Sequence, residues 1–92
     1  MLTKVRVEKI SNGVYVGLTD HTSSVYKSTL WIASKLVDMG YQFTEIDPYG
    51  SIKVETDDYK GVVDCVKDYL KEEEYIESIE NDSKHITFNI VE

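Results

Sequence analysis

VYKSTLWIASKLVDMGYQFTEIDPYGSIKV, residues 25–54, changes its apolar spacing in the middle, and this change indicates the fold class. The first part has the period of a helix, which we place over residues 24–39. Ser23 or Ser24 can cap its start, and Gly40 stands where a helix often ends in the left-handed conformation. One half of the helical wheel is apolar and is expected to face the core; it holds Val25, Tyr26, Thr29, Leu30, Ile32, Ala33, Leu36, Val37 and Met39.

After Gly40, apolar and polar residues alternate through residues 41–46, which is the pattern of a strand. Asp47-Pro48-Tyr49-Gly50 then has proline and glycine at the positions that a tight turn prefers. Ile52 and Val54 continue the alternation, so the two runs predict a β-hairpin.

Related patterns on both sides complete the order of elements. Asn12-Gly13 separates two alternating runs and favours a tight hairpin turn between them. Asp57 can accept the first backbone N–H groups of a second helix, whose apolar stripe has Cys65 at its edge. The predicted elements are strands near 3–10 and 14–19, a helix over about 58–74, a strand through Ile76 and Ile79, a turn at 81–83 and a strand over 86–90.

The resulting order is ββαββαββ in a single domain that spans residues 1–92. Consecutive hairpins favour an antiparallel sheet, and two helices with one apolar side each favour a second layer. We therefore expect an α+β fold with two layers, in which both helices lie on one face of the sheet. The residues expected to be mostly buried are Leu30, Ile32, Leu36, Val63, Val66, Leu70 and Phe88.

The composition narrows the class of protein. The 92 residues are 41% hydrophobic, which is too apolar for a disordered chain and enough for one small core. Cys65 is the single cysteine, the first residues lack a signal-peptide pattern, and no apolar run approaches the ~20 residues of a membrane span. We therefore expect a cytoplasmic protein.

Motifs for catalysis or cofactor binding are missing from the sequence. His21 and His85 fit no metal-ligand spacing, and Asp57-Asp58 lacks the glycine and glutamate of a calcium loop. A nucleophile built from Cys65 and His85 competes with the simpler interpretation of Cys65 as a buried thiol. We expect no enzyme, no metal and no other cofactor; a small hydrolase using a carboxylate pair is the weakest alternative.

The charges are strongly polarised along the chain. Residues 1–44 carry three acidic and five basic residues, a net charge of +2, whereas residues 45–92 carry fourteen acidic and five basic residues, a net charge of −9. A fold needs no such polarisation. The strongly negative half of the chain repels nucleic acid and attracts basic protein surfaces, so we expect protein partners and no direct binding of nucleic acid.

An acidic column on the second helix is the clearest part of this charge. Asp64, Asp68 and Glu72 recur at every fourth residue, which places them on one side of the helix about 6 Å apart, comparable to the spacing of phosphates along a nucleic-acid strand. The alternative is an ordinary solvated helix face, in which interspersed lysines pair with the acids: Lys60, Lys67 and Lys71.

Trp31 falls in the middle of the polar side of the first helix, where the core does not need it. Tryptophan is enriched at the energetic centres of protein contacts. We expect a homodimer with Trp31 at its interface, which would leave the acidic halves facing outward. Packing of the indole against a flanking loop is the alternative.

In length, charge layout and whole-chain character, from Met1-Leu2-Thr3-Lys4 to Ile90-Val91-Glu92, the sequence resembles the small acidic DNA-mimic proteins of bacteriophages. Within that class it resembles the anti-restriction nuclease (Arn) family of T-even phages. The resemblance implies a dimer whose carboxylates imitate duplex phosphates. It also implies inhibition of the host restriction endonuclease McrBC and competition with DNA for the histone-like protein H-NS.

No short family motif transfers residue by residue, so the candidate phosphate mimics come from the charge pattern itself. They are Asp57, Asp58, Asp64, Asp68, Glu72, Glu73, Glu74, Glu77, Glu80 and Asp82. The interspersed lysines depart from an unbroken acidic face. The main alternative function is a protein-interaction module that acts through an apolar contact around Trp31.

Overall fold

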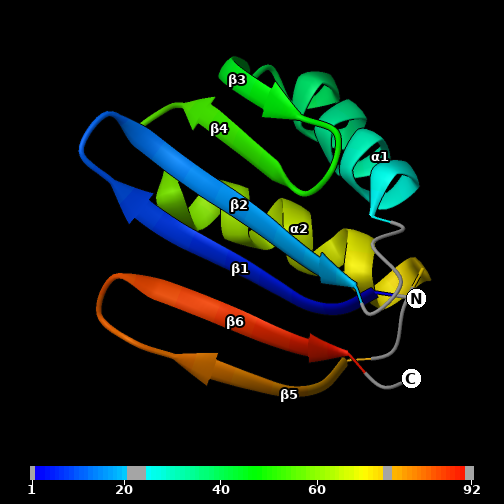
Figure 1. The fold of residues 1–92 in the computed structure, drawn as a ribbon. Helices are drawn as coiled ribbons and strands as arrows, with labels where there is room; N and C mark the ends of the chain where they lie inside the picture. The colour runs from blue at the N-terminus through cyan, green and yellow to red at the C-terminus, as the bar shows by residue number, and fades with distance from the viewer. Residues whose placement is uncertain (1, 21–24, 74–75, 91–92) are drawn as a thin grey trace.

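The computed structural model describes residues 2–20, 25–73 and 76–90, which form six strands and two helices (Figure 1). The expected Ser23 and Ser24 caps lie outside these residues. The elements, in chain order, are β1 (Leu2–Ile10), β2 (Gly13–Asp20), α1 (Tyr26–Asp38), β3 (Gln42–Asp47), β4 (Ser51–Glu55), α2 (Tyr59–Glu73), β5 (Ile76–Asn81) and β6 (His85–Ile90).

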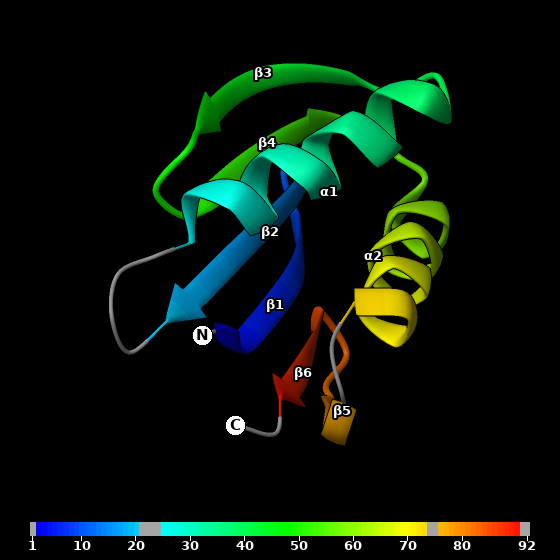
Figure 2. The ribbon, with the colours of Figure 1, turned by 90° about the vertical axis from the view of Figure 1, so that its right-hand side faces the viewer.

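All six strands belong to one sheet in the order β3-β4-β2-β1-β6-β5, and every neighbouring pair is antiparallel. The β1–β2 hairpin is central, and the β3–β4 and β5–β6 hairpins flank it. Both helices lie on the same face of the sheet (Figures 1 and 2). The predicted α+β class, the element order and the two-layer arrangement are thus confirmed.

Alternation in β1 separates the two faces of the sheet. Val5 and Val7 are fully buried under the helices, while Arg6 lies on the face without helices. The turn into β2 depends on Gly13, whose φ is +157°. A Cβ atom there would collide with the carbonyl oxygen of Val54 in the adjacent β4, so glycine is required by backbone conformation and by space.

α1 ends as the sequence predicts. Gly40 has a φ of +92° and donates its N–H to the Val37 carbonyl, while the Tyr41 N–H reaches back to the Leu36 carbonyl. This pair of hydrogen bonds is the Schellman arrangement, which satisfies carbonyl groups left over at the end of a helix. The chain is thereby turned back into β3.

The buried side of α1 is narrower than half of the wheel. Leu30, expected in the core, is 41% exposed, so that prediction is wrong; Tyr26, Val37 and Met39 are exposed as well. α1 lies over β3 and β4 at one end of the sheet, and only one stripe of the helix meets the sheet and α2. The buried residues on and just before the helix are Val25, Thr29, Ile32, Ala33 and Leu36.

α2 packs across the central strands. Val62, Val66 and Leu70 are fully buried, Val63 is partly buried, and Cys65 lies inside the core instead of at its edge. Asp58, and not Asp57, caps the helix. Its Oδ1 accepts the Gly61 N–H at 3.0 Å.

The other expected strands and turns are present with small shifts in their bounds. Ile32, Leu36 and Phe88 are fully buried, as predicted. The turn at residues 47–50 is closed by the Gly50 N–H, which donates to the Asp47 carbonyl at 3.1 Å. β5 continues through Asn81, one residue into the predicted turn. Among the described residues, neither helix is long and apolar enough to cross a membrane.

The core assignment predicts a sharp difference between two neighbouring residues of α1. Leu36→Ala should lower the free energy of unfolding by about 2–5 kcal/mol, because Leu36 is fully buried and its loss leaves a cavity. Val37→Ala is the matched control and should cost less than about 0.5 kcal/mol, since Val37 is 55% exposed. Urea unfolding measures both; similar losses would refute the packing of α1.

Candidate protein-interaction surface

The acidic column of α2 lies on the flank of the helix that faces α1. Asp68 lines a hollow between the helices together with Lys35, Asp38, Met39 and Cys65. One helical turn later, Glu72 accepts a hydrogen bond from Lys35 Nζ at 3.2 Å, and this contact raises the pKa of the lysine. Asp64, Asp68 and Glu72 are therefore exposed along one side of α2, and Glu73 is exposed on another side of the same helix.

At 100° per residue, the lysines of α2 lie just beside the acidic column. Lys60 lines a shallow hollow with Val63 and with Ile86 of β6, on the side away from α1. Within the part of the chain that the structure describes, Lys60, Lys67 and Lys71 form no ion pair. Asp64, Asp68 and Glu73 form none there either. Within the described residues, no lysine of α2 is therefore paired with a carboxylate of the same helix.

Asp58 is held by the fold. Besides capping α2, it accepts a hydrogen bond from the Tyr41 hydroxyl at 2.8 Å through Oδ2. This contact, followed by the Gly61 N–H, lowers the pKa of Asp58. Burial and the Asp58 contact raise the pKa of Tyr41 to about 12. A Cβ atom on Gly61 would overlap both groups, so the glycine makes room for this pair.

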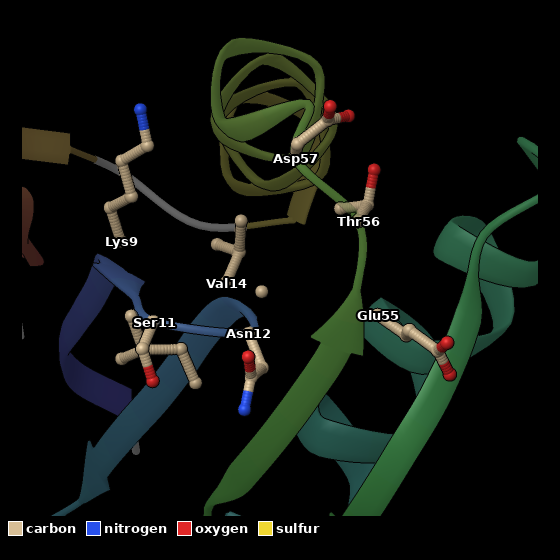
Figure 3. A pocket seen from close by; sticks show the side chains of 9 residues that line it. Lys9, Ser11, Asn12, Val14, Glu55, Thr56 and Asp57 are labelled. Carbon is tan, nitrogen blue, oxygen red and sulfur yellow. The ribbon is translucent and has the colours of Figure 1, made fainter.

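Asp57 points away from the acidic column. It lines a cavity of about 370 Å³ at the end of the β1–β2 hairpin, opposite Lys9 and beside Glu55 and Thr56 (Figure 3). The lining mixes one ammonium with two carboxylates and small polar side chains. Such an open, mixed surface favours no particular ligand, and Asp57 stands apart from the other candidates.

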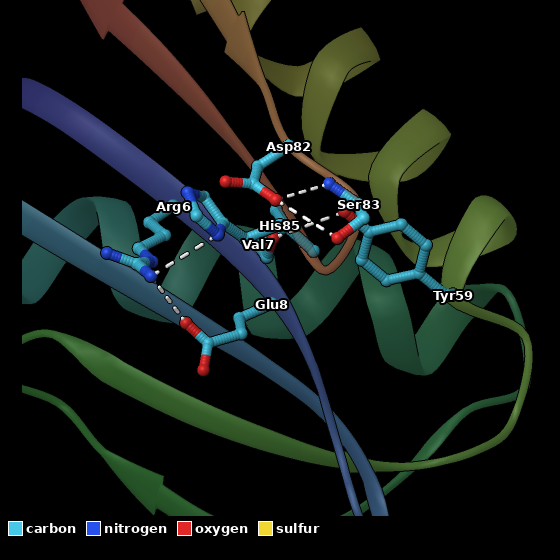
Figure 4. A network of polar contacts seen from close by, with 7 residues as sticks. All are labelled: Arg6, Val7, Glu8, Tyr59, Asp82, Ser83 and His85. Carbon is cyan, nitrogen blue, oxygen red and sulfur yellow. Dashed lines mark hydrogen bonds and ion pairs between the residues drawn. The ribbon is translucent and has the colours of Figure 1, made fainter.

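The acidic residues of β5 and its turn form a separate group. Glu80 accepts a hydrogen bond from Asn89 Nδ2 at 3.1 Å, and their pairing register puts both on the face without helices. Asp82 accepts hydrogen bonds from the Ser83 hydroxyl and backbone, which lower its pKa (Figure 4). Glu77 is exposed at an irregularity of β5, and Glu74 lies outside the described residues.

Trp31 is 54% exposed and lines a small hollow with Lys27 of α1 and with Tyr69 and Glu73 of α2. It is not alone, because several other large apolar side chains on α1 and the β3–β4 hairpin are exposed. Among them, the Tyr26 and Tyr49 rings lie 6.4 Å apart. We call these residues the exposed apolar group: Tyr26, Leu30, Val37, Ile46 and Tyr49. The helical wheel predicted a core position for the first three.

Cys65 and His85, considered above as a catalytic pair, lie in different parts of the structure. Cys65 is buried in the core, and burial raises the pKa of its thiol, which disfavours the reactive thiolate. His85 lies on the face without helices, where its Nδ1 is 3.4 Å from Arg6 Nη2 (Figure 4). In the described ranges, no three His, Cys, Asp or Glu side chains gather as metal ligands. His21 lies outside these ranges.

Comparisons with known proteins find no matching family model, no matching curated protein and no matching solved structure.

The contact between Tyr41 and Asp58 predicts a specific dependence of stability on alkaline pH. Because the folded state raises the pKa of Tyr41 from 10.0 to about 12, the stabilisation is complete below pH 10 and is lost as the pH rises to 12. Tyr41→Phe removes this titration. Denaturant unfolding between pH 9 and 12 should show the wild type losing more stability than the variant. Parallel curves across that window would exclude the linkage.

Proposed function

We propose that this chain is an acidic DNA-mimic protein, which occupies the DNA-binding site of another protein and thereby inhibits it. The observation that carries the proposal is the set of exposed carboxylates on α2: Asp64, Asp68 and Glu73 have no ion-pair partner among the described residues. The net charge of −7 adds a long-range attraction for basic surfaces.

Regular spacing on a rigid element supports mimicry. Carboxylates four residues apart on a helix are separated by about 6 Å along its axis, similar to successive phosphates of one strand. α2 is anchored by a fully buried stripe, so its carboxylates have defined positions before a partner arrives. Such preorganisation lowers the entropy lost on binding.

Direct binding of nucleic acid is disfavoured by the pairing of basic side chains. Arg6 contacts Glu8 at 2.8 Å, and Lys53 contacts Glu45 at 3.2 Å. Since DNA binding depends on basic groups that neutralise phosphates, these pairs and the negative net charge leave the chain poorly suited to it.

The resemblance to phage anti-restriction proteins suggests which partners to test. These are the restriction endonuclease McrBC and the histone-like protein H-NS of a bacterial host, met in the host cytoplasm. Both bind duplex DNA, so a common ligand that imitates phosphates would act on either.

The α2 surface predicts a position-specific loss of inhibition. A triple variant, Asp64→Asn/Asp68→Asn/Glu73→Gln, should weaken displacement of labelled duplex DNA from H-NS by about tenfold, since three charge contacts of roughly 0.5 kcal/mol are lost. The control Glu8→Gln/Glu45→Gln/Glu55→Gln has the same net charge and should change displacement by less than about twofold.

Fluorescence anisotropy of the DNA gives the displacement curve, and circular dichroism verifies that each variant is folded. Equal weakening by both triple variants would mean that net charge alone acts. Undiminished inhibition by a folded α2 variant would remove this helix from the working surface.

A second proposal, which is compatible with the first, is self-association through α1. The exposed Trp31 and the other exposed apolar side chains of α1 favour it, and the half of the sequence that contains α1 has a net charge of +2. Two copies that meet through this part would keep the strongly acidic elements apart. The same apolar area is the basis of the alternative function, a contact with a different protein around Trp31.

Sedimentation velocity tests the self-association. The wild type should form a dimer at roughly micromolar concentration, and Trp31→Ala should weaken it, because the indole is a large exposed apolar group. Ile79→Ala is the control: Ile79 is 44% exposed but belongs to β5. A strict monomer at every accessible concentration, or equal effects of both variants, would contradict an interface at Trp31.

A further inference from the structure

The surface between the two helices is hollowed in two places, and we call this surface the groove. Residues near the start of α1 line one hollow with residues near the end of α2, and residues near the end of α1 line the other with residues in the middle of α2. The two helices therefore run in opposite senses where they meet and cross at a steep angle (Figure 2). Two hollows of about 240 and 150 Å³ lie along the groove; the larger is lined by Lys35, Asp38, Met39, Cys65 and Asp68, and the smaller by Lys27, Trp31, Tyr69 and Glu73.

The base of the larger hollow is apolar. Cys65 is buried beneath it, and Met39, which is 59% exposed, forms one wall. Methionine adapts its shape to irregular apolar partners and is common at surfaces that bind amphipathic helices. The hollow has room for one aliphatic side chain of the size of leucine or methionine.

The rim of the groove is predominantly acidic. Asp38 and Asp68 flank the larger hollow, and Glu73 lies at the smaller one. Lys35 is already engaged by Glu72 at 3.2 Å, which leaves Lys27 as the basic side chain lining the groove that has no ion pair in the described chain. An occupant therefore gains from positive charge beside an apolar group.

We propose that this groove binds a cationic amphipathic helix of a partner protein, which inserts one apolar side chain between Met39 and Cys65. Lysine or arginine residues on both sides of that anchor contact Asp38 and Asp68. This deepens the proposed function and rests on it, because it gives the partner's basic surface a second, apolar element of recognition. The anchor adds a part of the affinity that salt does not screen.

The larger hollow is distinct from the exposed apolar residues on the other flank of α1, whereas Trp31, which lines the smaller hollow, belongs to both proposed surfaces. At 100° per residue, Lys35 and Met39 lie on the flank of α1 that faces α2, whereas Leu30 and Val37 lie on the opposite flank. A second copy docked on Leu30 and Val37 thus leaves the larger hollow open. The two sites can be separated by substitutions in the same helix.

The test uses a fluorescein-labelled peptide of about four helical turns, with leucine on one side and lysine on the other. Met39→Ser should weaken its binding by about tenfold, because an apolar wall of the hollow is lost. Val37→Ser is the matched control and should change the affinity by less than about twofold. Both residues are more than half exposed, so both variants should fold.

A second peptide, with serine in place of leucine and all lysines retained, separates insertion from charge attraction. At high salt the leucine peptide should stay bound to the wild type while the serine peptide dissociates. Equal affinities of the two peptides, or equal losses in Met39→Ser and Val37→Ser, would overturn the proposal. A loss confined to Val37→Ser would assign the peptide to the other flank and overturn it as well.

Failure here and failure of DNA mimicry have different signatures. Met39→Ser changes no charge, whereas the triple variant of α2 leaves Met39 in place. If the triple variant loses DNA displacement while Met39→Ser binds the leucine peptide normally, mimicry stands and the groove proposal falls. The reverse result removes mimicry and retains a groove for cationic helices.

Discussion

The packing of α2 on the central strands is the contact on which the rest of the molecule depends. Val62, Val66 and Leu70 of the helix are fully buried against the sheet. Because one face of the sheet is covered and the other is not, this single layer of contacts has to supply the core of a small domain. It also fixes which sides of α2 remain in water, and those sides carry the exposed carboxylates of the helix.

The start of α2 is fixed by a single side chain. Asp58 caps the helix through one carboxylate oxygen and binds the Tyr41 hydroxyl through the other. Tyr41 follows the end of α1 and precedes β3, so the contact joins the two helices and one end of the sheet. Asp58 and Asp68 are both exposed acids, yet the first stabilises the fold and the second is available to a partner. The role of an acidic residue in this chain therefore depends on its contacts, and not on its position in an acidic run.

Local patterns predicted much of the fold, because local patterns determine it. The alternation at Val5 and Val7, the turn at Gly50 and the left-handed Gly40 each reflect backbone preferences that act within a few residues. Leu30 was misassigned because a helical wheel cannot show how much of an apolar side meets a neighbour. That width depends on where α1 crosses the sheet. Asp58 caps α2 instead of Asp57 because its carboxylate contacts the Tyr41 hydroxyl and the Gly61 N–H. Tyr41 is distant in the sequence, and Gly61 has no side chain that would indicate the contact.

The candidate surface was predictable only in part, for the same physical reason. Spacing alone indicated that Asp64, Asp68 and Glu72 share one side of a helix. It did not indicate that Lys35 of the other helix binds Glu72, or that Glu80 lies on the opposite face of the sheet. Such facts follow from strand register and helix packing, which involve residues far apart in the chain. The groove between the helices depends on the same long-range arrangement.

The central claim is that a basic, DNA-binding surface recognises the carboxylates of α2 as it recognises phosphates. The most direct measurement is the affinity of this protein for H-NS as a function of salt concentration, beside the affinity of duplex DNA for H-NS under the same conditions. For both ligands, the logarithm of affinity should fall steeply and linearly with the logarithm of salt concentration. An affinity that is insensitive to salt, with DNA still displaced, would contradict recognition through charge.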